Sequence, residues 1–213
     1  MHHLVLFGPP GSGKGTQGEF LAQSGFIKLS PGDLIRAEIQ KKTILGKTLE
    51  DVLNKGSLVE SKLIYELMGK IDVQNSSYVF DGFPRNKEQL DFFHSSLMKN
   101  TKYTVLHLAV GKEIIKERLQ LRLVCSQCGL VYNDLSKNPI KENTCNECGG
   151  LLIKRSDDQS SIINQRIAIY EQETIPLIKM CKEKNIQVYD IDASLGIEEV
   201  KKTIERIVIS LEK

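Results

Sequence analysis

Short apolar runs alternate with longer amphipathic stretches along most of the chain. Five runs are apolar or β-prone and predict strands at 4–7, 26–29, 78–80, 103–110 and 186–191. The stretches between them have helical periodicity and predict helices at about 14–24, 31–42, 45–56, 60–71, 86–99, 111–123, from about 157 onward, and at the C-terminus. This alternation predicts an α/β fold, in which helices flank a parallel sheet that binds ligands at the carboxyl ends of its strands. Residues 30–59 and 122–156 interrupt the alternation and are candidate subdomains.

Composition and charge narrow the class of protein. The chain has 213 residues, of which 40% are hydrophobic and 26% charged, and its formal net charge is +2. This length is enough for one well-buried core with a small insertion or two. A net charge so close to zero gives no global basic field, so we expect no nucleic acid as the main partner. No apolar run approaches the roughly 18 residues that span a bilayer, and the N-terminus lacks a signal-peptide layout, so we expect a cytoplasmic protein without a membrane partner.

The first predicted strand leads into a glycine-rich turn, GPPGSGKGTQ. Gly8, four further residues and the pair Gly13-Lys14 match the phosphate-binding loop that joins a strand to a helix. Glycines allow successive backbone N–H groups to face a phosphate, the helix N-terminus adds its dipole, and Lys14 adds a positive charge. The alternative is a turn that binds nothing, and Lys14 and Thr16 argue against it. Gly15 stands where serine or threonine usually follows the lysine, which argues against ordinary magnesium ligation by that hydroxyl.

Two Cys-x-x-Cys pairs lie sixteen residues apart, at Cys125, Cys128, Cys145 and Cys148. This spacing is typical of a zinc site, and a reducing cytosol disfavours disulfides, so a redox pair is the weaker alternative. Four thiolates complete a tetrahedron and leave no open position for a substrate, so we expect a structural Zn²⁺. The fifth cysteine, Cys181, lies alone on a predicted helix, and we expect it to be buried.

The charge around the cysteines tests whether this part of the chain binds a nucleic acid. Between residues 123 and 152 the charged side chains are Lys137, Lys141, Asp134, Glu142 and Glu147. They sum to −1, and a Zn²⁺ with four thiolates adds −2, which gives −3 in total. A protein that binds a phosphate backbone should be basic. We therefore interpret the zinc site as a staple that stiffens a segment too small to hold a core of its own.

The chain has seven arginines against 22 lysines, and six of the seven lie in or beside candidate motifs. Arginine is the side chain suited to bidentate phosphate binding. Arg118 and Arg122 are four residues apart on the predicted helix 111–123, and Arg166 lies on the apolar stripe of the helix from about 157. Arginines on core-facing stripes need anionic partners because an unpaired buried charge is costly. These partners are either acidic side chains or the phosphates of a ligand, and the glycine-rich loop favours phosphates.

The start of the long helix carries a further cluster of charges. Ser156 and Gln159 fit a capping box, which places Arg155 at the entrance to the helix and Asp157 and Asp158 in its first turn. The two aspartates either complement the helix dipole and do no more, or belong to the site. At this point both interpretations remain open.

Six motifs occur in the order GPPGSGKGTQ, SPGDLIRAEI, GSLV, FDGFPRNKEQ, RLQLRLVCSQCG and LLIKRSDDQSSIINQR. With them the sequence resembles an adenylate kinase of the bacterial, zinc-bearing, long-lid type, over essentially the whole chain. The resemblance implies a core of residues 1–29, 60–121 and 160–213, a segment at 30–59 that binds the nucleoside monophosphate, and a lid at 122–159. It also implies a monomer that uses Mg²⁺ to catalyse ATP + AMP ⇌ 2 ADP.

The resemblance assigns roles to the residues that match the family's motifs. For ATP they are Gly11, Ser12, Gly13, Lys14, Gly15, Thr16, Arg122, Val131, Tyr132 and Leu195. For AMP they are Pro31, Arg36, Ser57, Leu58, Val59, Gly82, Phe83, Pro84, Arg85, Gln89, Arg155 and Arg166. For phosphoryl transfer they are Lys14, Arg85, Arg118, Arg122, Arg155 and Arg166, with Asp81 orienting Mg²⁺ through water. The nucleophile is a phosphate oxygen that is already anionic, so we expect no general base, and catalysis would be positioning and charge neutralisation.

One residue of the AMP site departs from the family's pattern. Pro31 stands where the family usually has threonine, and proline offers neither a hydroxyl nor an N–H. The GFPRN motif is also frequent in pyrimidine nucleotide kinases, so a UMP/CMP kinase is the alternative, although the Gln89 amide suits the edge of adenine. A third hypothesis comes from another class of protein: a non-catalytic zinc-ribbon module that uses nucleotide binding as a switch. The arginines and the DGFPR motif argue against it.

Overall fold

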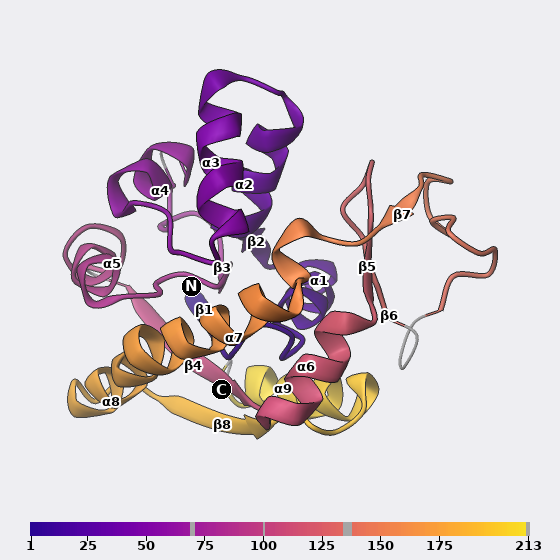
Figure 1. The fold of residues 1–213 in the computed structure, drawn as a ribbon. Coiled ribbons are helices and arrows are strands. Elements are labelled where there is room, and N and C mark those ends of the chain that lie inside the picture. The colour runs from indigo at the N-terminus through magenta and orange to yellow at the C-terminus, as the bar shows by residue number, and fades with distance from the viewer. Residues whose placement is uncertain (69–70, 100, 134–137, 212–213) are drawn as a thin grey trace.

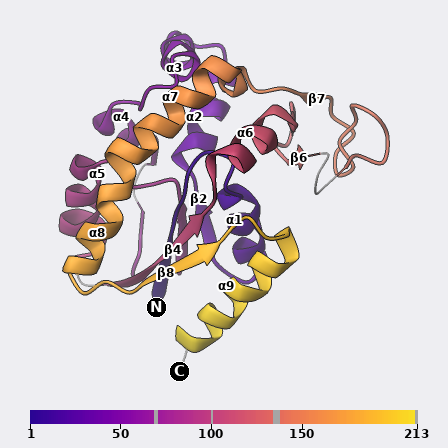
Figure 2. The same cartoon turned by 60° about the horizontal axis from the view of Figure 1, so that its bottom comes forward.

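A parallel, five-stranded sheet in the order β2-β3-β1-β4-β8 forms the centre of the molecule, and helices cover both of its faces (Figures 1 and 2). The computed structural model describes residues 1–68, 71–99, 101–133 and 138–211. The strands of the sheet are β1 (His2–Phe7), β2 (Ile27–Leu29), β3 (Tyr78–Asp81), β4 (Lys102–Ala109) and β8 (Val188–Asp192). The prediction of an α/β fold with a parallel sheet flanked by helices is confirmed.

The core lies on both faces of β1. Leu4, Val5 and Leu6 are fully buried, with Val5 in one apolar cluster and its two neighbours in another. A parallel sheet that is covered on both faces needs apolar side chains at successive positions, which explains the short continuous runs in the sequence. The strands all point the same way, so the residues that follow β1 and β3 meet at one edge of the sheet.

The helices account for most of the remaining chain. In chain order they are α1 (Lys14–Gln23), α2 (Pro31–Gln40), α3 (Ile44–Asn54), α4 (Ser61–Met68), α5 (Lys87–Phe92), α6 (Lys112–Gln120), α7 (Ser160–Ile169), α8 (Ile175–Glu183) and α9 (Ile197–Leu211). Two π-helical turns, η1 (Phe93–Leu97) and η3 (Tyr170–Thr174), extend α5 and join α7 to α8. As Figure 1 shows, α2 and α3 stand side by side and project away from the sheet. None of the helices among the described residues has the length and apolar character to cross a membrane.

The four zinc-motif cysteines lie in a separate projection, the cysteine segment (residues 122–159), whose small antiparallel sheet has the order β6-β5-β7 (Figure 1). Its strands are β5 (Arg122–Cys125), β6 (Val131–Asn133) and β7 (Leu152–Ile153). The prediction that Arg118 and Arg122 share one helix is wrong, because α6 ends at Gln120 and Arg122 opens β5. Pairing of Arg122 with Asn133 and of Val124 with Val131 fixes an extended backbone, so tertiary pairing overrides the helical periodicity.

The predicted start of the long helix is also wrong. Ser156–Asp158 form a single 3-10 turn, η2, and α7 begins at Ser160 without a side-chain cap from Gln159. The capping box does not form because the Gln159 backbone is extended, so the helix cannot begin before Ser160. Residues 69–70 of the predicted helix 60–71, together with Asp134 and Lys137 of the charge count, lie outside the described residues.

Candidate active site and metal site

The glycine-rich loop runs from the end of β1 into α1. Gly13 has a φ of +94°, a left-handed conformation that suits glycine and starts the helix. The Lys14 ammonium group donates hydrogen bonds to the carbonyl oxygens of Gly8 at 2.7 Å and Pro9 at 2.8 Å. The lysine thus lies over its own loop, with its charge held at the edge of the sheet where ligands are expected.

The charge of Lys14 is poorly solvated. Burial lowers its pKa to about 7; the Asp81 carboxylate opposes this shift, and the guanidinium groups of Arg85 and Arg166 add to it. An anion bound beside the amine would reverse the shift and favour the protonated form. A phosphate bound at the loop would therefore increase the fraction of Lys14 that is protonated.

Asp81 is the last residue of β3 and lies beside the loop. Its side chain is buried, and one carboxylate oxygen is 3.6 Å from the position that a Cβ on Gly15 would occupy. The register places Asp81 opposite Leu6 of β1, so the sheet itself fixes the distance between this carboxylate and the loop. An oxygen ligand in this position fits Mg²⁺, which binds through few carboxylates and keeps several waters.

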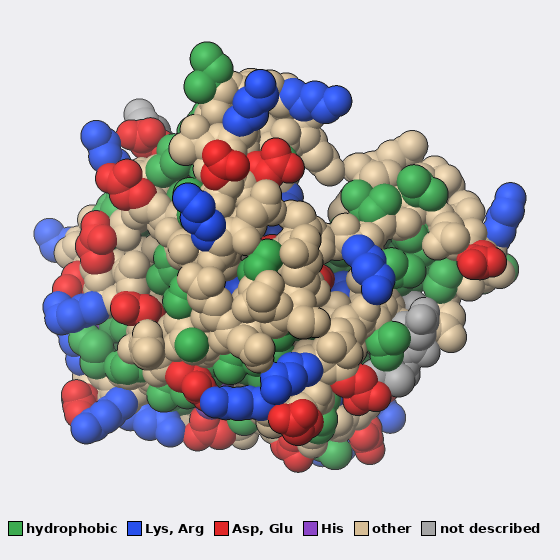
Figure 3. Space-filling model, viewed as in Figure 1, with side chains coloured by type: hydrophobic (Ala, Val, Ile, Leu, Met, Phe, Trp, Pro, Cys, Tyr) green, Lys and Arg blue, Asp and Glu red, His purple; other side chains and the backbone are tan. Residues whose placement is uncertain are grey.

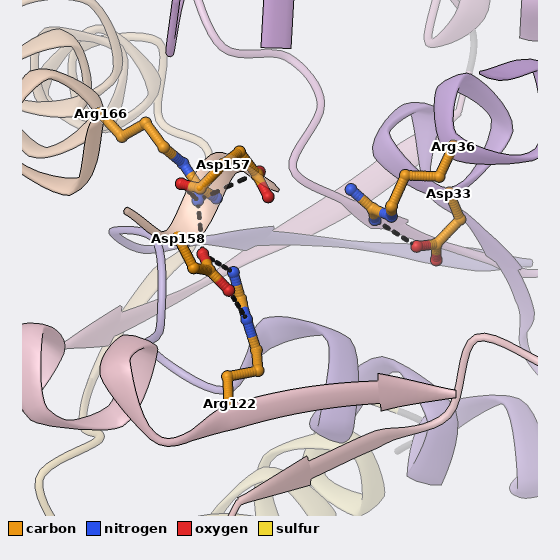
Figure 4. A network of polar contacts seen from close by, with 6 residues as sticks. All are labelled: Asp33, Arg36, Arg122, Asp157, Asp158 and Arg166. Carbon is orange, nitrogen blue, oxygen red and sulfur yellow. Dashed lines mark hydrogen bonds and ion pairs between the residues drawn. The ribbon is translucent and has the colours of Figure 1, made fainter. Parts of the chain in front are cut away.

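Two aspartates of η2 bind arginines from two separate elements (Figure 4). Arg122 of β5 grips Asp158 with two nitrogens, Nε donating to Oδ2 at 2.7 Å. Arg166 of α7 donates to the same carboxylate at 2.8 Å and pairs with Asp157 at 3.1 Å. Asp158 thereby joins the cysteine segment to α7. Asp157 and Asp158 therefore pair with arginines and are more than complements of a helix dipole.

The charges of this cluster perturb one another. Burial alone would raise the pKa of Asp157, but the guanidinium groups of Arg166 and Arg122 hold it below its usual range. Burial, together with Arg122 and Arg36, lowers the pKa of Arg155 to about 9, and the Nε atom of Arg155 is buried without a hydrogen-bond partner. A guanidinium with an unpaired buried donor and cationic neighbours favours an anionic ligand.

Arg118 lies apart from this cluster. Its guanidinium donates to backbone carbonyl oxygens, that of Ala193 at 2.7 Å and those of Ser194 and Leu195 at 3.4 and 3.5 Å. No acidic side chain among the described residues pairs with Arg118, and the expectation of a phosphate partner stays a prediction. Carbonyl oxygens at the end of β8 satisfy its donors, and the contact places Arg118 next to Leu195, a residue assigned to ATP by resemblance.

The two helices α2 and α3 bring Arg36 to the same side of the sheet. Ser30 caps α2 by accepting a hydrogen bond from the Asp33 N–H at 3.3 Å, and Pro31 is the first, buried residue of the helix. Asp33 pairs with Arg36 (Figure 4), and its other oxygen accepts from Lys28 at 3.1 Å. Asp33 was not among the predicted site residues, although it lies three positions before Arg36 on the same predicted helix, a spacing that favours an ion pair.

The residues after β3 form a compact turn around Arg85. Gly82 has a φ of +69°, and a Cβ there would lie 2.9 Å from the Arg85 guanidinium, so only glycine fits. Arg85 donates from Nε to the Gly82 carbonyl and from its backbone N–H to the Gln89 side-chain oxygen, both at 2.8 Å. Phe83 and Pro84, which lie between Gly82 and Arg85 in the chain, are buried. Thr174, which was not predicted, holds this turn from η3.

The remaining predicted residues are more dispersed. Val59 is buried, whereas Ser57 and Leu58 are half-buried in the connection after α3. Leu195 is 45% exposed. The side chain of Tyr132 belongs to the interior of the cysteine segment, where its hydroxyl accepts from the Asn146 N–H at 2.7 Å.

The four cysteines converge, with their sulfur atoms all within 4.8 Å of one another. Cys125 and Cys148 are 3.4 Å apart and Cys128 and Cys145 are 3.6 Å apart between Sγ atoms, close to the roughly 3.8 Å edge of a tetrahedral zinc–thiolate site. The Tyr132 hydroxyl, 3.5 Å from Cys145 Sγ, lowers the pKa of that thiol to about 6 and so favours the thiolate. The donor set fits Zn²⁺. Cys181 is fully buried, as predicted.

The surface is hollowed between the α2–α3 helices and the cysteine segment, and the two projections touch where Gln40 donates to the Ser126 carbonyl at 3.2 Å (Figure 3). A cavity of about 460 Å³ opens at the base of the cysteine segment. Its lining residues are Gln120, Lys154, Arg155, Ser156, Asp158, Gln159 and Ser160. Of the predicted basic site residues, Arg155 lines this cavity.

A parallel sheet, a glycine-rich loop with its lysine, and arginines from several separate elements are typical of enzymes that transfer phosphoryl groups between nucleotides. The adenylate kinase family model matches residues 6–186. The adenylate kinase of Hydrogenobaculum is 39% identical over 92% of this chain and 95% of its own, and that of Fervidobacterium nodosum is 35% identical over 99% of both. The adenylate kinase of Archaeoglobus fulgidus is 34% identical over 96% of this chain and 97% of its own. The chain belongs to the adenylate kinase family, whose members transfer phosphoryl groups and bind adenine nucleotides.

Proposed function

We propose that this protein catalyses ATP + AMP ⇌ 2 ADP. The observation that carries the proposal is the placement of Lys14, Asp81, Arg85, Arg122 and Arg166 around one edge of the sheet, on elements that the fold positions independently. Phosphoryl transfer between two nucleotides needs cations such as Lys14 and these arginines, because the two substrates together bring several negative charges to one place. It needs no proton acceptor, since the attacking phosphate oxygen is already ionised.

ATP would lie along the loop and under the cysteine segment, which would act as a lid. Residues 11–16 would surround its phosphates through backbone N–H groups, with Lys14 at the transferred group. Arg122 would grip the phosphates as the lid closes. Arg118, held at the Leu195 carbonyl, would lie at the base end of ATP and not at the transferred phosphate. Val131 and Tyr132 would contribute from β6.

AMP would lie between the α2–α3 helices and the turn after β3. Arg36 and Arg85 would bind its phosphate, and Gln89 would contact its base, with Pro31, residues 57–59 and residues 82–84 around them. Arg155 and Arg166 would meet the phosphates between the two substrates. Asp157 and Asp158 pair with Arg122 and Arg166, and phosphate oxygens would replace these carboxylate oxygens as substrates bind. This exchange keeps the guanidinium groups oriented before the reaction.

Two metals would serve different purposes. Mg²⁺, bound with the nucleotide, supplies charge neutralisation between phosphate groups, and Asp81 would orient it through water. Zn²⁺, held by the four cysteines, would be structural because no ligand position remains open. Closure of the lid and of the α2–α3 segment (residues 30–59) would exclude water, which competes with AMP as acceptor. We further propose a monomeric, cytoplasmic enzyme without a nucleic acid partner; on the face shown in Figure 3 basic and acidic side chains are interspersed.

Product analysis tests the proposal directly. Zinc-loaded protein is incubated with Mg-ATP and AMP, CMP, UMP or GMP in turn, and diphosphates are separated by chromatography. We expect ADP to form rapidly with AMP alone. Preferential turnover of CMP or UMP would instead identify a pyrimidine nucleotide kinase, the alternative suggested by the GFPRN motif. Folded protein that binds ATP but produces no diphosphate from any acceptor would contradict the enzyme proposal and favour a nucleotide-dependent switch.

A further inference from the structure

Thr174 is a buried residue with an unusual hydrogen bond. It is the last residue of η3 and is 6% exposed, and its hydroxyl donates to the Arg85 carbonyl at 2.8 Å, across 89 positions of sequence. Two other threonines in helices behave differently. The hydroxyls of Thr48 and Thr203 donate to the carbonyls four residues earlier in their own helices, at 3.2 and 3.0 Å. The Thr174 hydroxyl therefore donates to a residue outside its own helix, although threonines in helices commonly donate to the carbonyl four residues earlier.

The hydrogen bond from Thr174 is the first of a chain of contacts that reaches Gln89. The backbone N–H of Arg85 donates to Gln89 Oε1 at 2.8 Å, and the Gln89 backbone is held by the Asn86 side chain at 2.9 Å. A backbone N–H is a donor only, so it fixes which end of the amide faces it. The amide of Gln89, 3% exposed, therefore keeps its oxygen toward Arg85, and among the described residues none accepts a hydrogen bond from its Nε2.

A fixed amide distinguishes between nucleobases. Its N–H matches a ring nitrogen that accepts, as in adenine and cytosine, while the second lone pair of its oxygen suits the adjacent exocyclic amine. Guanine and uracil present a ring N–H at the same place, which would meet an N–H. An amide that was free to rotate by 180° would accommodate both patterns, because it would exchange donor and acceptor. The discrimination therefore depends on the rigidity of the Arg85 backbone.

We propose that Thr174 is a positioning residue for the monophosphate site, which holds the Arg85 backbone so that the Gln89 amide keeps one orientation and selects the base. The inference rests on the proposed function, since it assigns Gln89 to the acceptor nucleotide. Thr174 itself touches no substrate. It acts from the junction between α7 and α8, through the Arg85 carbonyl.

Three variants test this role. Thr174→Val removes the hydroxyl at nearly constant volume, Thr174→Ser restores it, and Thr104→Val is the matched control. Thr104 is also fully buried and hydrogen-bonded, to His2 at 2.7 Å, but it lies at the opposite end of the sheet. For Thr174→Val we expect KM for AMP to rise about threefold to tenfold, the range that one net hydrogen bond supports, with KM for ATP within about twofold. The ratio of kcat/KM for AMP over UMP should fall by a similar factor.

The outcomes separate positioning from stability. Thr174→Ser should restore both KM for AMP and the base ratio, and Thr104→Val should lower the melting temperature without changing either. The inference is overturned if Thr174→Val changes the two KM values equally, or if only its melting temperature falls.

The inference and the proposed function fail in different ways. If the wild-type protein transfers no phosphoryl group, the proposed function fails, and calorimetric titration with AMP and UMP still measures whether Thr174→Val weakens the preference between them. If the wild type is an active AMP kinase and its base ratio does not respond to Thr174→Val, the inference alone is wrong.

Discussion

The parallel sheet and the cysteine segment are held together in different ways. In the sheet, side chains such as Leu106 and Val105 are fully buried between layers of helices, and many apolar contacts share the stabilisation. Among its described residues, the buried apolar cluster of the cysteine segment consists of Cys125, Tyr132, Cys145 and Leu152. Its neighbouring side chain Leu151 is 59% exposed, so the segment cannot rely on apolar burial.

This difference matters for the candidate site because its arginines come both from the cysteine segment and from the helices that cover the sheet. Arg122 comes from the cysteine segment and Arg166 from α7, and Asp158 joins them. A segment whose structure depends on one local site can move as a unit against a rigid sheet. We therefore expect substitutions in the two regions to have separable effects. Those in the cysteine segment should unfold the segment and spare the sheet, and those in the sheet should lower the stability of the whole protein.

Removal of the metal site should have the largest effect. Structural zinc contributes apparent folding free energies of about 10–16 kcal/mol in small zinc domains, so without it the cysteine segment should lose its structure. Cys145→Ser protein should contain no tightly bound zinc and should show rapid hydrogen exchange across residues 122–159, with slow exchange retained in β1 and β4. Cys181→Ser, a change at the lone buried cysteine, serves as the control and should retain one zinc per chain. Slow hydrogen exchange in the cysteine segment of metal-free Cys145→Ser protein would show that the segment does not depend on zinc.

Lys14→Gln should abolish most activity while leaving the fold intact. Loss of one preorganised charge at a transferring group typically costs about 10²–10³ in kcat. The melting temperature should stay the same or rise, because the substitution removes a poorly solvated charge from the loop. Steady-state kinetics and thermal unfolding provide the measurements, with the exposed α9 variant Lys202→Gln as control. Wild-type turnover by Lys14→Gln would exclude the loop from the active site.

A pair of leucine substitutions sharpens the contrast between the regions. Leu106→Ala, in the middle of the sheet, should lower the global free energy of unfolding by about 2–5 kcal/mol, because the cavity cannot collapse between packed layers. Leu152→Ala should leave the global denaturation midpoint nearly unchanged and should speed hydrogen exchange only within the cysteine segment. Urea unfolding and exchange mass spectrometry measure the two effects. A global loss of stability from Leu152→Ala would mean that the segment and the sheet unfold as one unit.

The smallest predicted effect is a pH dependence of ATP binding. The free enzyme holds the pKa of Lys14 near 7, and bound phosphate would raise it, so binding should take up a proton above that pH. Affinity should therefore fall between about pH 7.5 and 9, by at most about tenfold per pH unit. Calorimetry in buffers of different ionisation enthalpy measures the proton uptake. In Lys14→Arg, whose guanidinium stays protonated, the uptake should disappear; equal uptake in both proteins would assign the proton to another group.

The sequence predicted the sheet and the local motifs well. The run Leu4–Phe7 and the following glycines indicated β1 and its loop because their signals are contained in a few adjacent residues. The spacing of the cysteines likewise indicated the cluster that the structure contains. Arg122 was assigned to the wrong element, since its helical spacing from Arg118 competes with strand pairing to Asn133, which lies eleven residues away. The capping-box interpretation of Ser156 failed because the extended backbone of Gln159 separates the turn at Ser156 from α7.

By itself, the sequence determined the motifs whose residues lie close together along the chain. It provided a loop able to follow a phosphate, a lysine at its end, four thiols at zinc spacing, and arginines in suitable numbers. Only the tertiary structure decided which groups meet: Asp158 with Arg122 and Arg166, Arg118 with the carbonyls after β8, and Thr174 with Arg85. A buried donor forms its hydrogen bond with whichever acceptor the packed elements bring within about 3 Å. The identity of this acceptor depends on how distant segments fold together.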